Sequence, residues 1–121
     1  MAKAVRYHKQ GGPEVLQLDE VTVGDPGQGQ VRIRHTAIGV NFVDTYQRSG
    51  LYPMQLPAVA GNEGAGVIEA VGAGVSDRKA GDRVCALLGG GGYAETGLLT
   101  APTTSWTPMS VRPYKQQWGV A

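Results

Sequence analysis

The sequence predicts a mainly β domain, and three observations support this. The chain has 121 residues, which is about the length of one domain with one core. Its 19 glycines and 7 prolines are about a fifth of the residues, more than long helices tolerate. Short stretches that alternate polar and apolar residues, separated by turn signals, fill the chain up to about Leu99.

The amino-terminal part of this pattern is expected to form strands. The alternating stretches are residues 5–7, 15–21 and 31–36. The turn Gly11-Gly12-Pro13 separates the first two and predicts a hairpin-like start. In the third, Val31, Ile33 and His35 face one side, which predicts a half-buried strand.

A short helix is predicted near residues 41–49, because the hydrophobic period changes there. Val40, Val43 and Tyr46 or Gln47 fall at helical spacing, and Asn41 is a suitable cap. Two prolines make residues 51–57 irregular.

Strands are expected again after this segment. Residues 66–71 alternate, and the apolar run 83–88 is typical of an inner strand. Four glycines follow, and another strand is expected to begin at Tyr93. The alternation stops near residue 100, so we predict a domain over 1–100 and an atypical tail over 101–121.

The glycine run Gly89–Gly92 formally matches a dinucleotide-binding turn, but its surroundings do not. Such a turn needs a following helix, a second parallel strand and an acidic residue about twenty positions further on. The sequence after Tyr93 offers none of these. We therefore interpret the run as a hairpin loop.

Charge and cysteine content exclude several classes of function. The net charge is +1 without a basic cluster, which gives no support for binding to nucleic acid or to an anionic membrane surface. Cys85 is the one cysteine, so neither an internal disulfide nor a multi-cysteine zinc site can form. The sequence shows no signal peptide or membrane span, and the cytoplasm is the expected location.

Four ordered motifs within residues 1–100 carry a family resemblance. They are residues 8–16, residues 41–52, the stretch Gly61-Asn62-Glu63-Gly64-Ala65-Gly66, and Gly81-Asp82-Arg83-Val84. The pattern resembles the amino-terminal GroES-like domain of medium-chain dehydrogenases/reductases, and within them the zinc-free quinone oxidoreductases of the ζ-crystallin type. This resemblance implies a partly open β-barrel that is the substrate-side domain of an NADPH-dependent enzyme.

The resemblance also implies a site without metal. Zinc members of the superfamily have Cys at the position of Asn41 and His at that of Asn62, and an amide is a poor zinc ligand. The other candidate ligands, His8, His35 and Cys85, match no metal-binding spacing and are interpreted as structural, with Cys85 as a small core residue.

In such a site the nicotinamide donates hydride, and the protein supplies orientation and hydrogen bonds to the developing oxyanion. The resemblance implies catalytic roles for Asn41 and Tyr52, beside the quinone. Asn62 and Glu63 are expected at the substrate pocket or just behind it. The NADPH contacts that it implies are Phe42, Val43, Asp44, Thr45 and Tyr46.

Each of these residues also has a purely structural interpretation. Asn41 is equally a helix cap, Tyr46 a core aromatic, Tyr52 a loop anchor and Asn62 a turn residue. A buried Glu63 would need a partner, and Arg48 and Arg83 both carry the right charge.

Full-length members of the family have a Rossmann domain as well, for which these 121 residues leave no room. We therefore expect little or no activity from this polypeptide alone. The tail lacks the acidic, apolar continuation of the family and is interpreted as disordered or frameshifted. The codons for residues 102–109, read one nucleotide earlier, can encode Ala-Asp-Asp-Leu-Val-Asp-Ala-His. This peptide looks more like the continuation expected for the family.

Two other functions stay open at this point. Zinc-free relatives also reduce enoyl thioesters and other activated alkenes. GroES itself has the same barrel, so a non-catalytic binding module is the second alternative. The choice of substrate and the oligomeric state are not readable from the sequence.

Overall fold

The computed structural model describes residues 1–101 and 104–106 of the chain. The elements of this part, in chain order, are β1 (Ala2–Tyr7), η1 (Pro13–Val15, a 3₁₀ turn), β2 (Gln17–Val21), β3 (Gln30–Ile38), α1 (Phe42–Ser49), β4 (Ala58–Val59), β5 (Glu63–Val71), β6 (Arg83–Leu87), β7 (Thr96–Thr100) and β8 (Thr104–Trp106). The prediction of a mainly β domain with one short helix is therefore confirmed.

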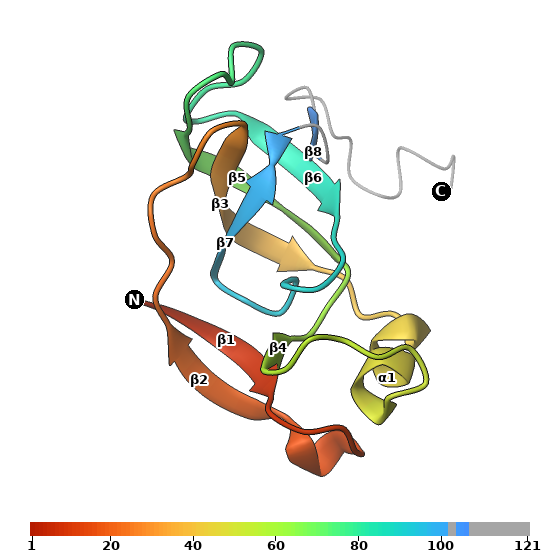
Figure 1. Ribbon diagram of the computed structural model, residues 1–121. Coiled ribbons are helices and arrows are strands. Elements are labelled where there is room, and N and C mark those ends of the chain that lie inside the picture. Colours follow the sequence, from red (N-terminus) through yellow and green to blue (C-terminus); the bar gives the residue numbers. More distant parts are fainter. Residues whose placement is uncertain (102–103, 107–121) are drawn as a thin grey trace, which may run out of the picture.

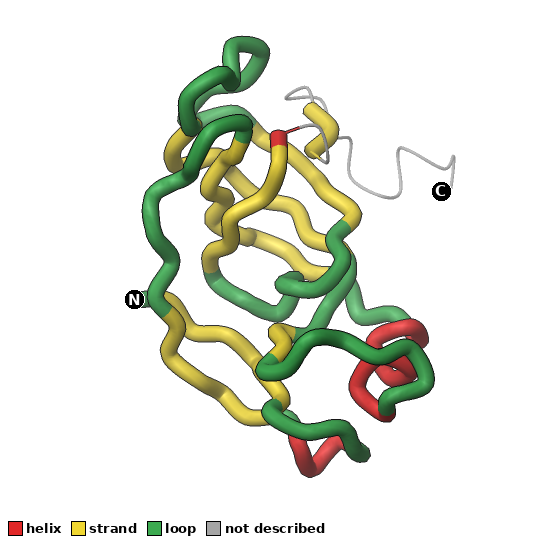
Figure 2. The backbone as a smooth tube through the Cα atoms, in the orientation of Figure 1, coloured by secondary structure: helices red, strands yellow, loops and turns green. Residues whose placement is uncertain are grey.

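The strands form two antiparallel sheets (Figure 1). The small sheet has the order β2-β1-β4, and the large sheet has the order β7-β3-β5-β6-β8. The loop between β6 and β7 runs between the two sheets (Figure 2) and joins them, because Val5 N–H donates to Tyr93 O at 2.8 Å and Ala4 pairs with Ala94. Within the described residues the sheets do not close on each other, in agreement with the predicted partly open barrel.

Each sheet has its own apolar core. The large-sheet core consists of Val31, Ile33, Ile68, Val84 and Ala101. The small-sheet core consists of Tyr7, Val15, Ala58 and Ala60, with Leu16, Met54 and Tyr93 packed against it. The predicted inward direction of Val31 and Ile33 is confirmed, since both are almost fully buried.

Helix α1 begins and ends as the sequence predicted, but it buries a different face. Asn41 is its N-cap, and Gly50 ends it in the left-handed region with φ 92°. The expected apolar face is wrong, because Val40 is 80% exposed and the residue that α1 buries is Asp44. No helix in the described residues is long and apolar enough to span a bilayer.

Two strand predictions are also corrected. Burial alternates along β6, so the continuously buried strand expected over 83–88 is wrong, and Leu87 is largely exposed. Cys85 is half-buried on the face opposite the core residues Val84 and Ala86, so it is not a core residue. β7 begins at Thr96, because Tyr93 belongs to the loop that joins the sheets.

Part of the tail adds to the large sheet. Residues of β8 pair antiparallel with β6, with Cys85 opposite Ser105, and Ala101 lies in the large-sheet core. Residues 102–103 and 107–121 lie outside the described residues. They include most of the tail over 101–121 that the sequence led us to interpret as disordered or frameshifted.

Candidate functional site

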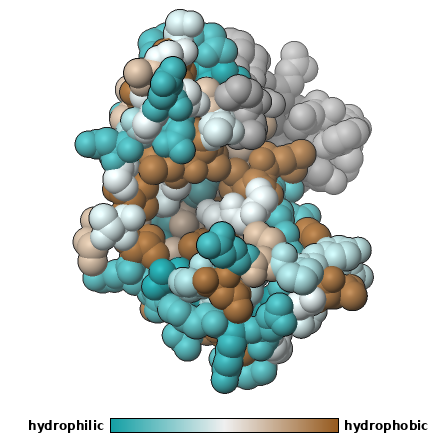
Figure 3. Space-filling model, in the orientation of Figure 1, coloured by the Kyte–Doolittle hydropathy of each residue, from teal (hydrophilic) through white to brown (hydrophobic). Residues whose placement is uncertain are grey.

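Three of the predicted site residues form an exposed aromatic row at α1. The rings of Phe42 and Tyr46 lie 5.7 Å apart and those of Tyr46 and Tyr52 lie 5.6 Å apart, both edge to face. Phe42 is 77% exposed, Tyr52 is 54% exposed and Tyr46 is 37% exposed. We call Phe42, Tyr46 and Tyr52 the aromatic row. Figure 3 shows that apolar surface also gathers in a band across the middle of the face in view.

Local geometry explains why these rings meet. Phe42 and Tyr46 are four residues apart on α1 and so lie on the same helix face. The left-handed Gly50 then reverses the chain, and Tyr52 N–H donates to Tyr46 O at 3.1 Å. Tyr46 is therefore not a core aromatic, and the row presents flat apolar surface beside the N-cap Asn41.

The opposite side of α1 carries a polar cluster around Asp44. Asp44 Oδ1 accepts from Asn62 Nδ2 at 2.5 Å, and Asp44 Oδ2 accepts from Tyr93 Oη at 2.6 Å and from Asn41 N at 3.0 Å. Asn62 and Gln47 pair through their amides: Asn62 Nδ2 donates to Gln47 Oε1 at 2.8 Å, and Gln47 Nε2 donates to Asn62 Oδ1 at 3.1 Å. We call Asp44, Gln47, Asn62 and Tyr93 the Asp44 cluster.

These hydrogen bonds set the ionisation of the cluster. Burial acts to raise the pKa of Asp44, but the hydrogen bonds from Tyr93, the Asn41 backbone and Asn62 outweigh it and lower that pKa. Burial and the hydrogen bond to Asp44 raise the pKa of Tyr93 to about 12. At neutral pH the carboxylate is therefore the acceptor and the phenol is the donor.

Glycines bring Tyr93 within reach of Asp44. Gly61 has φ +96°, and a Cβ there would lie 2.8 Å from Tyr93 N. A Cβ on Gly92 would lie 2.9 Å from the carbonyl carbon of Gly61. The backbone N–H of Gly91 donates to Val59 O and that of Gly92 to Gly61 O. These two N–H groups are occupied within the protein, which disfavours the phosphate-binding interpretation of Gly89–Gly92. The hairpin-loop interpretation is wrong, because β6 pairs with β5 and β8 while β7 pairs with β3, so the run belongs to a loop between strands that do not pair with each other.

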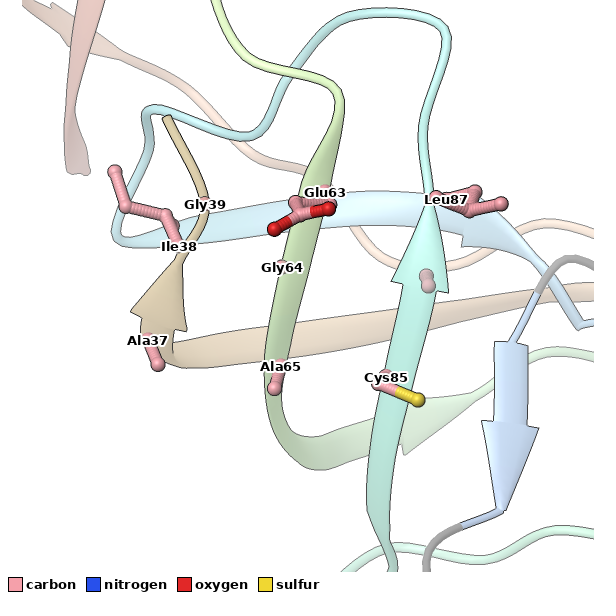
Figure 4. A pocket seen from close by; sticks show the side chains of 9 residues that line it. Ala37, Ile38, Gly39, Glu63, Gly64, Ala65, Cys85 and Leu87 are labelled. Carbon is pink, nitrogen blue, oxygen red and sulfur yellow. The ribbon is translucent and has the colours of Figure 1, made fainter. Parts of the chain in front are cut away.

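Glu63 lies apart from the aromatic row, in a pocket on the outer face of the large sheet (Figure 4). The pocket has a volume of about 420 Å³. It is lined by Ala37, Ile38, Gly39, Glu63, Gly64, Ala65, Cys85, Ala86 and Leu87. The Glu63 side chain packs over Gly39, where any Cβ would collide with it. Arg48 makes no ion pair with Glu63, and its Nε donates to Gly11 O at 3.2 Å.

The histidines have contacts that fit the structural roles predicted for them. His8 Nε2 lies 2.8 Å from Asp19 Oδ2, and His35 Nδ1 lies 2.8 Å from Ala94 O. Among residues 1–101, no group of three or more His, Cys, Asp or Glu side chains is placed to hold a metal ion.

The sequence-predicted residues thus divide between two surfaces of α1. Phe42, Tyr46 and Tyr52 lie on the exposed side, whereas Asp44 and Asn62 lie on the buried side. Asn41 connects them, since it caps the helix and its N–H donates to Asp44. Thr45 donates its hydroxyl to Phe42 O within the helix, and Val43 is half-buried.

Sequence reasoning missed Gln47 and Tyr93. The signal for Asp44 itself was present, because Asn41 and Asp44 have the spacing of a helix-capping pair. Tyr93 lies 49 residues after Asp44 and no local pattern connects them.

Comparison with known proteins identifies the family of this domain. The family model for the alcohol dehydrogenase GroES-like domain matches residues 27–109. The chain belongs to this family, which is the domain predicted from the motifs. Its relatives include oxidoreductases of the medium-chain dehydrogenase/reductase superfamily.

The individual relatives are mostly quinone oxidoreductases. Quinone oxidoreductase 1 of Escherichia coli is 53% identical over 85 residues, covering 69% of this chain and 26% of the relative. The 2-haloacrylate reductase of a Burkholderia species is 52% identical over 92 residues, covering 73% of this chain and 28% of the relative. The structure of E. coli quinone oxidoreductase complexed with NADPH superposes with a TM-score of 0.87 at 42% identity, covering 91% of this chain and 34% of that one. The matched part of the chain thus spans about a quarter to a third of the length of these relatives.

Proposed function

We propose that this chain forms the substrate side of a zinc-independent, NADPH-dependent quinone oxidoreductase. The observation that carries the proposal is the exposed aromatic row beside the neutral amide of Asn41. The similarity to the quinone oxidoreductases, one of them complexed with NADPH, supports it.

The described residues fit the ring end of a nicotinamide cofactor and not its phosphates. Flat rings pack well against exposed aromatic side chains, which the aromatic row provides. In the glycine run the N–H groups of Gly91 and Gly92 donate to the backbone, so these two are not free to bind a pyrophosphate. When bound, NADPH supplies the hydride. We propose that the row and residues 42–46 hold the nicotinamide end against the substrate.

In this proposal the protein acts through neutral donors. The Asn41 amide and the Tyr52 hydroxyl donate hydrogen bonds to a quinone oxygen and stabilise the negative charge that develops on it. Zinc is not needed for this role. The position where zinc relatives have His is Asn62, and its amide is engaged by Asp44 and Gln47.

We further propose that the 121-residue polypeptide has little turnover by itself. The test is a fluorescence titration of the purified chain with NADPH, followed by a quinone-reduction assay in the same cuvette. Weak cofactor binding without turnover is expected. Saturable NADPH binding with turnover would show that the chain, or an assembly of it, holds more of the cofactor site.

The substrate-side residues need a test with the rest of the enzyme present. In a chimera, residues 1–100 of this chain replace the matching part of the E. coli relative. We expect quinone reduction, and a loss of at least about 10²-fold in kcat for Asn41→Asp, since an ionised carboxylate cannot donate to the oxyanion. Aspartate retains helix capping, so the variant separates the amide's chemistry from its structural role. Unchanged kcat in this variant would exclude Asn41 as the donor.

Reduction of an activated alkene is the second candidate, because the Burkholderia relative is named a 2-haloacrylate reductase. Its substrate also develops negative charge on an oxygen beside the reacting carbon, so the same donors would serve. Assaying the chimera with a quinone and with 2-chloroacrylate separates the two functions.

A further inference from the structure

The Asp44 cluster lies directly behind the residues proposed to meet the ligand. Asp44 is two residues from Tyr46 and three from Asn41 on the same helix. Asp44 is also the residue that α1 buries, so the helix does not dock through an apolar face. The position of α1 therefore depends largely on hydrogen bonds to the buried carboxylate of Asp44.

Those hydrogen bonds come from two separate segments of the chain. Asn62 precedes β5, and Tyr93 follows the glycine run between β6 and β7. Asn62 contacts Asp44 and also pairs with Gln47, so it joins α1 at two points one helical turn apart. Tyr93 also packs against the small-sheet core and its carbonyl accepts from Val5 N–H, so it connects α1 to the small sheet.

We propose that the Asp44 cluster is a positioning device, in which Tyr93 and Asn62 fix the orientation of α1 so that Asn41 and the aromatic row face the ligand. Tyr93 is a positioning residue that acts through Asp44. The nature of the ligand rests on the proposed function, whereas the fixation of α1 is independent of it.

Charged and titratable groups around Asp44 determine how the device responds to pH. Besides Tyr93, they are Arg48 on α1 itself and Tyr7 on β1, both of which interact electrostatically with the cluster. Burial raises the pKa of Tyr7, so its hydroxyl stays neutral in the acid range and does not contribute to the response there. Removal of the Tyr93 hydroxyl leaves Asp44 buried with one donor fewer, so its protonation occurs at higher pH.

The test compares Tyr93→Phe with Tyr7→Phe in the full chain. Tyr7 belongs to the small-sheet core but makes none of the cluster's hydrogen bonds. Tyr7→Phe therefore removes one hydroxyl without removing a hydrogen bond of the cluster. Hydrogen exchange of α1 amides is measured against that of β5 amides. Binding of duroquinone, which has no free ring position for attack by Cys85, is followed by fluorescence quenching as a function of pH.

We expect Tyr93→Phe to speed exchange in α1 by about tenfold, the equivalent of one hydrogen bond to a charged group, while β5 changes much less. Duroquinone affinity should fall by no more than the same factor, because only chains with a docked helix bind. The acid limit of α1 protection should also move to higher pH while that of β5 stays in place, whereas a general loss of stability would move both. Tyr7→Phe should show none of the three.

The proposal would be overturned if Tyr93→Phe speeds exchange equally in α1 and β5, or if it leaves the acid limit of α1 protection unchanged. If the wild-type chain does not bind duroquinone, the proposed function fails, and the exchange and its pH dependence still decide the role of Tyr93. If Tyr93→Phe does not fold, Gln47→Met takes its place. It removes the amide pair with Asn62 and should loosen α1 in the same direction, and unchanged α1 exchange would again count against the proposal.

Discussion

The large-sheet core and the Asp44 cluster hold the molecule together by different means. The core is formed by apolar side chains from β3, β5 and β6, and its contacts are nondirectional. The cluster surrounds one buried carboxylate with donors that must each meet it at hydrogen-bond distance. A core tolerates changes of shape at modest cost, whereas a buried charge requires all of its partners. The residues proposed to act on a ligand are attached to the second kind of structure.

The largest expected effect is on the large-sheet core. Ile33 is 1% exposed and packs within the core, so Ile33→Ala should lower the free energy of unfolding by about 2–5 kcal/mol. Urea denaturation followed by circular dichroism measures this. Ile38→Ala is the matched control, because Ile38 lies on the same strand and is 44% exposed. Equal costs for the two variants would contradict the assignment of the core.

The Asp44 cluster should respond next most strongly. Asp44→Asn keeps the shape of the side chain but replaces one acceptor oxygen by a donor, facing Tyr93, Asn41 N–H and Asn62. We expect a loss of about 1.5–3 kcal/mol, the usual range for a hydrogen bond to a charged group. Asp25→Asn is the control, since the Asp25 side chain is 97% exposed and its pair with Arg32 should contribute at most about 1 kcal/mol.

Acid should remove the same contribution without mutation. Three hydrogen bonds hold the pKa of Asp44 below its ordinary value despite burial. A carboxylate with a lowered folded-state pKa stabilises the protein above its unfolded pKa, and this stability disappears as the pH falls through the folded one. The stability difference between wild type and Asp44→Asn should therefore be constant near neutrality and shrink below about pH 4. A constant difference down to the acid transition would show that Asp44 does not titrate as described.

Alanine in place of the glycine that packs behind the cluster should have an effect comparable to that of Asp44→Asn. Gly61 and Gly81 have nearly the same positive φ, at +96° and +95°. Alanine at Gly81 meets open space and should cost about 1–2 kcal/mol of backbone strain. Alanine at Gly61 must in addition displace Tyr93 and Gly92, so it should cost more and should also speed hydrogen exchange in α1. Identical stabilities would mean that the close approach to Tyr93 is not required.

The same contrast explains how much the sequence alone predicted. Alternation identified Val31 and Ile33 as inward-facing, and the spacing around Asn41 identified α1 with its cap. These are local patterns with a fixed period. The buried side of α1 was not predicted, because a polar residue such as Asp44 is expected to face water unless its partners are known.

Those partners come from distant parts of the chain. Tyr93 reaches Asp44 only because Gly61 and Gly92 allow two loops to approach closely. The continuous apolar run at 83–88 misled for a related reason: the outer face of β6 borders an open pocket, so Cys85 and Leu87 are not in the core. The aromatic row was named residue by residue through the family resemblance, and its ligand contacts are still a prediction.

The smallest effect on stability is expected at the aromatic row, and it gives the sharpest separation of folding from binding. Phe42 is 77% exposed, so Phe42→Ala should change the free energy of unfolding by no more than about 0.5 kcal/mol. Its ring contact with Tyr46 would be lost, and duroquinone binding should weaken by about threefold, as for one aromatic contact. Val40→Ala, at an equally exposed residue outside the row, should change neither quantity. If Phe42→Ala lowers stability as much as Asp44→Asn does, the row is part of the packing of α1 and the division between a holding side and a binding side of the helix is wrong.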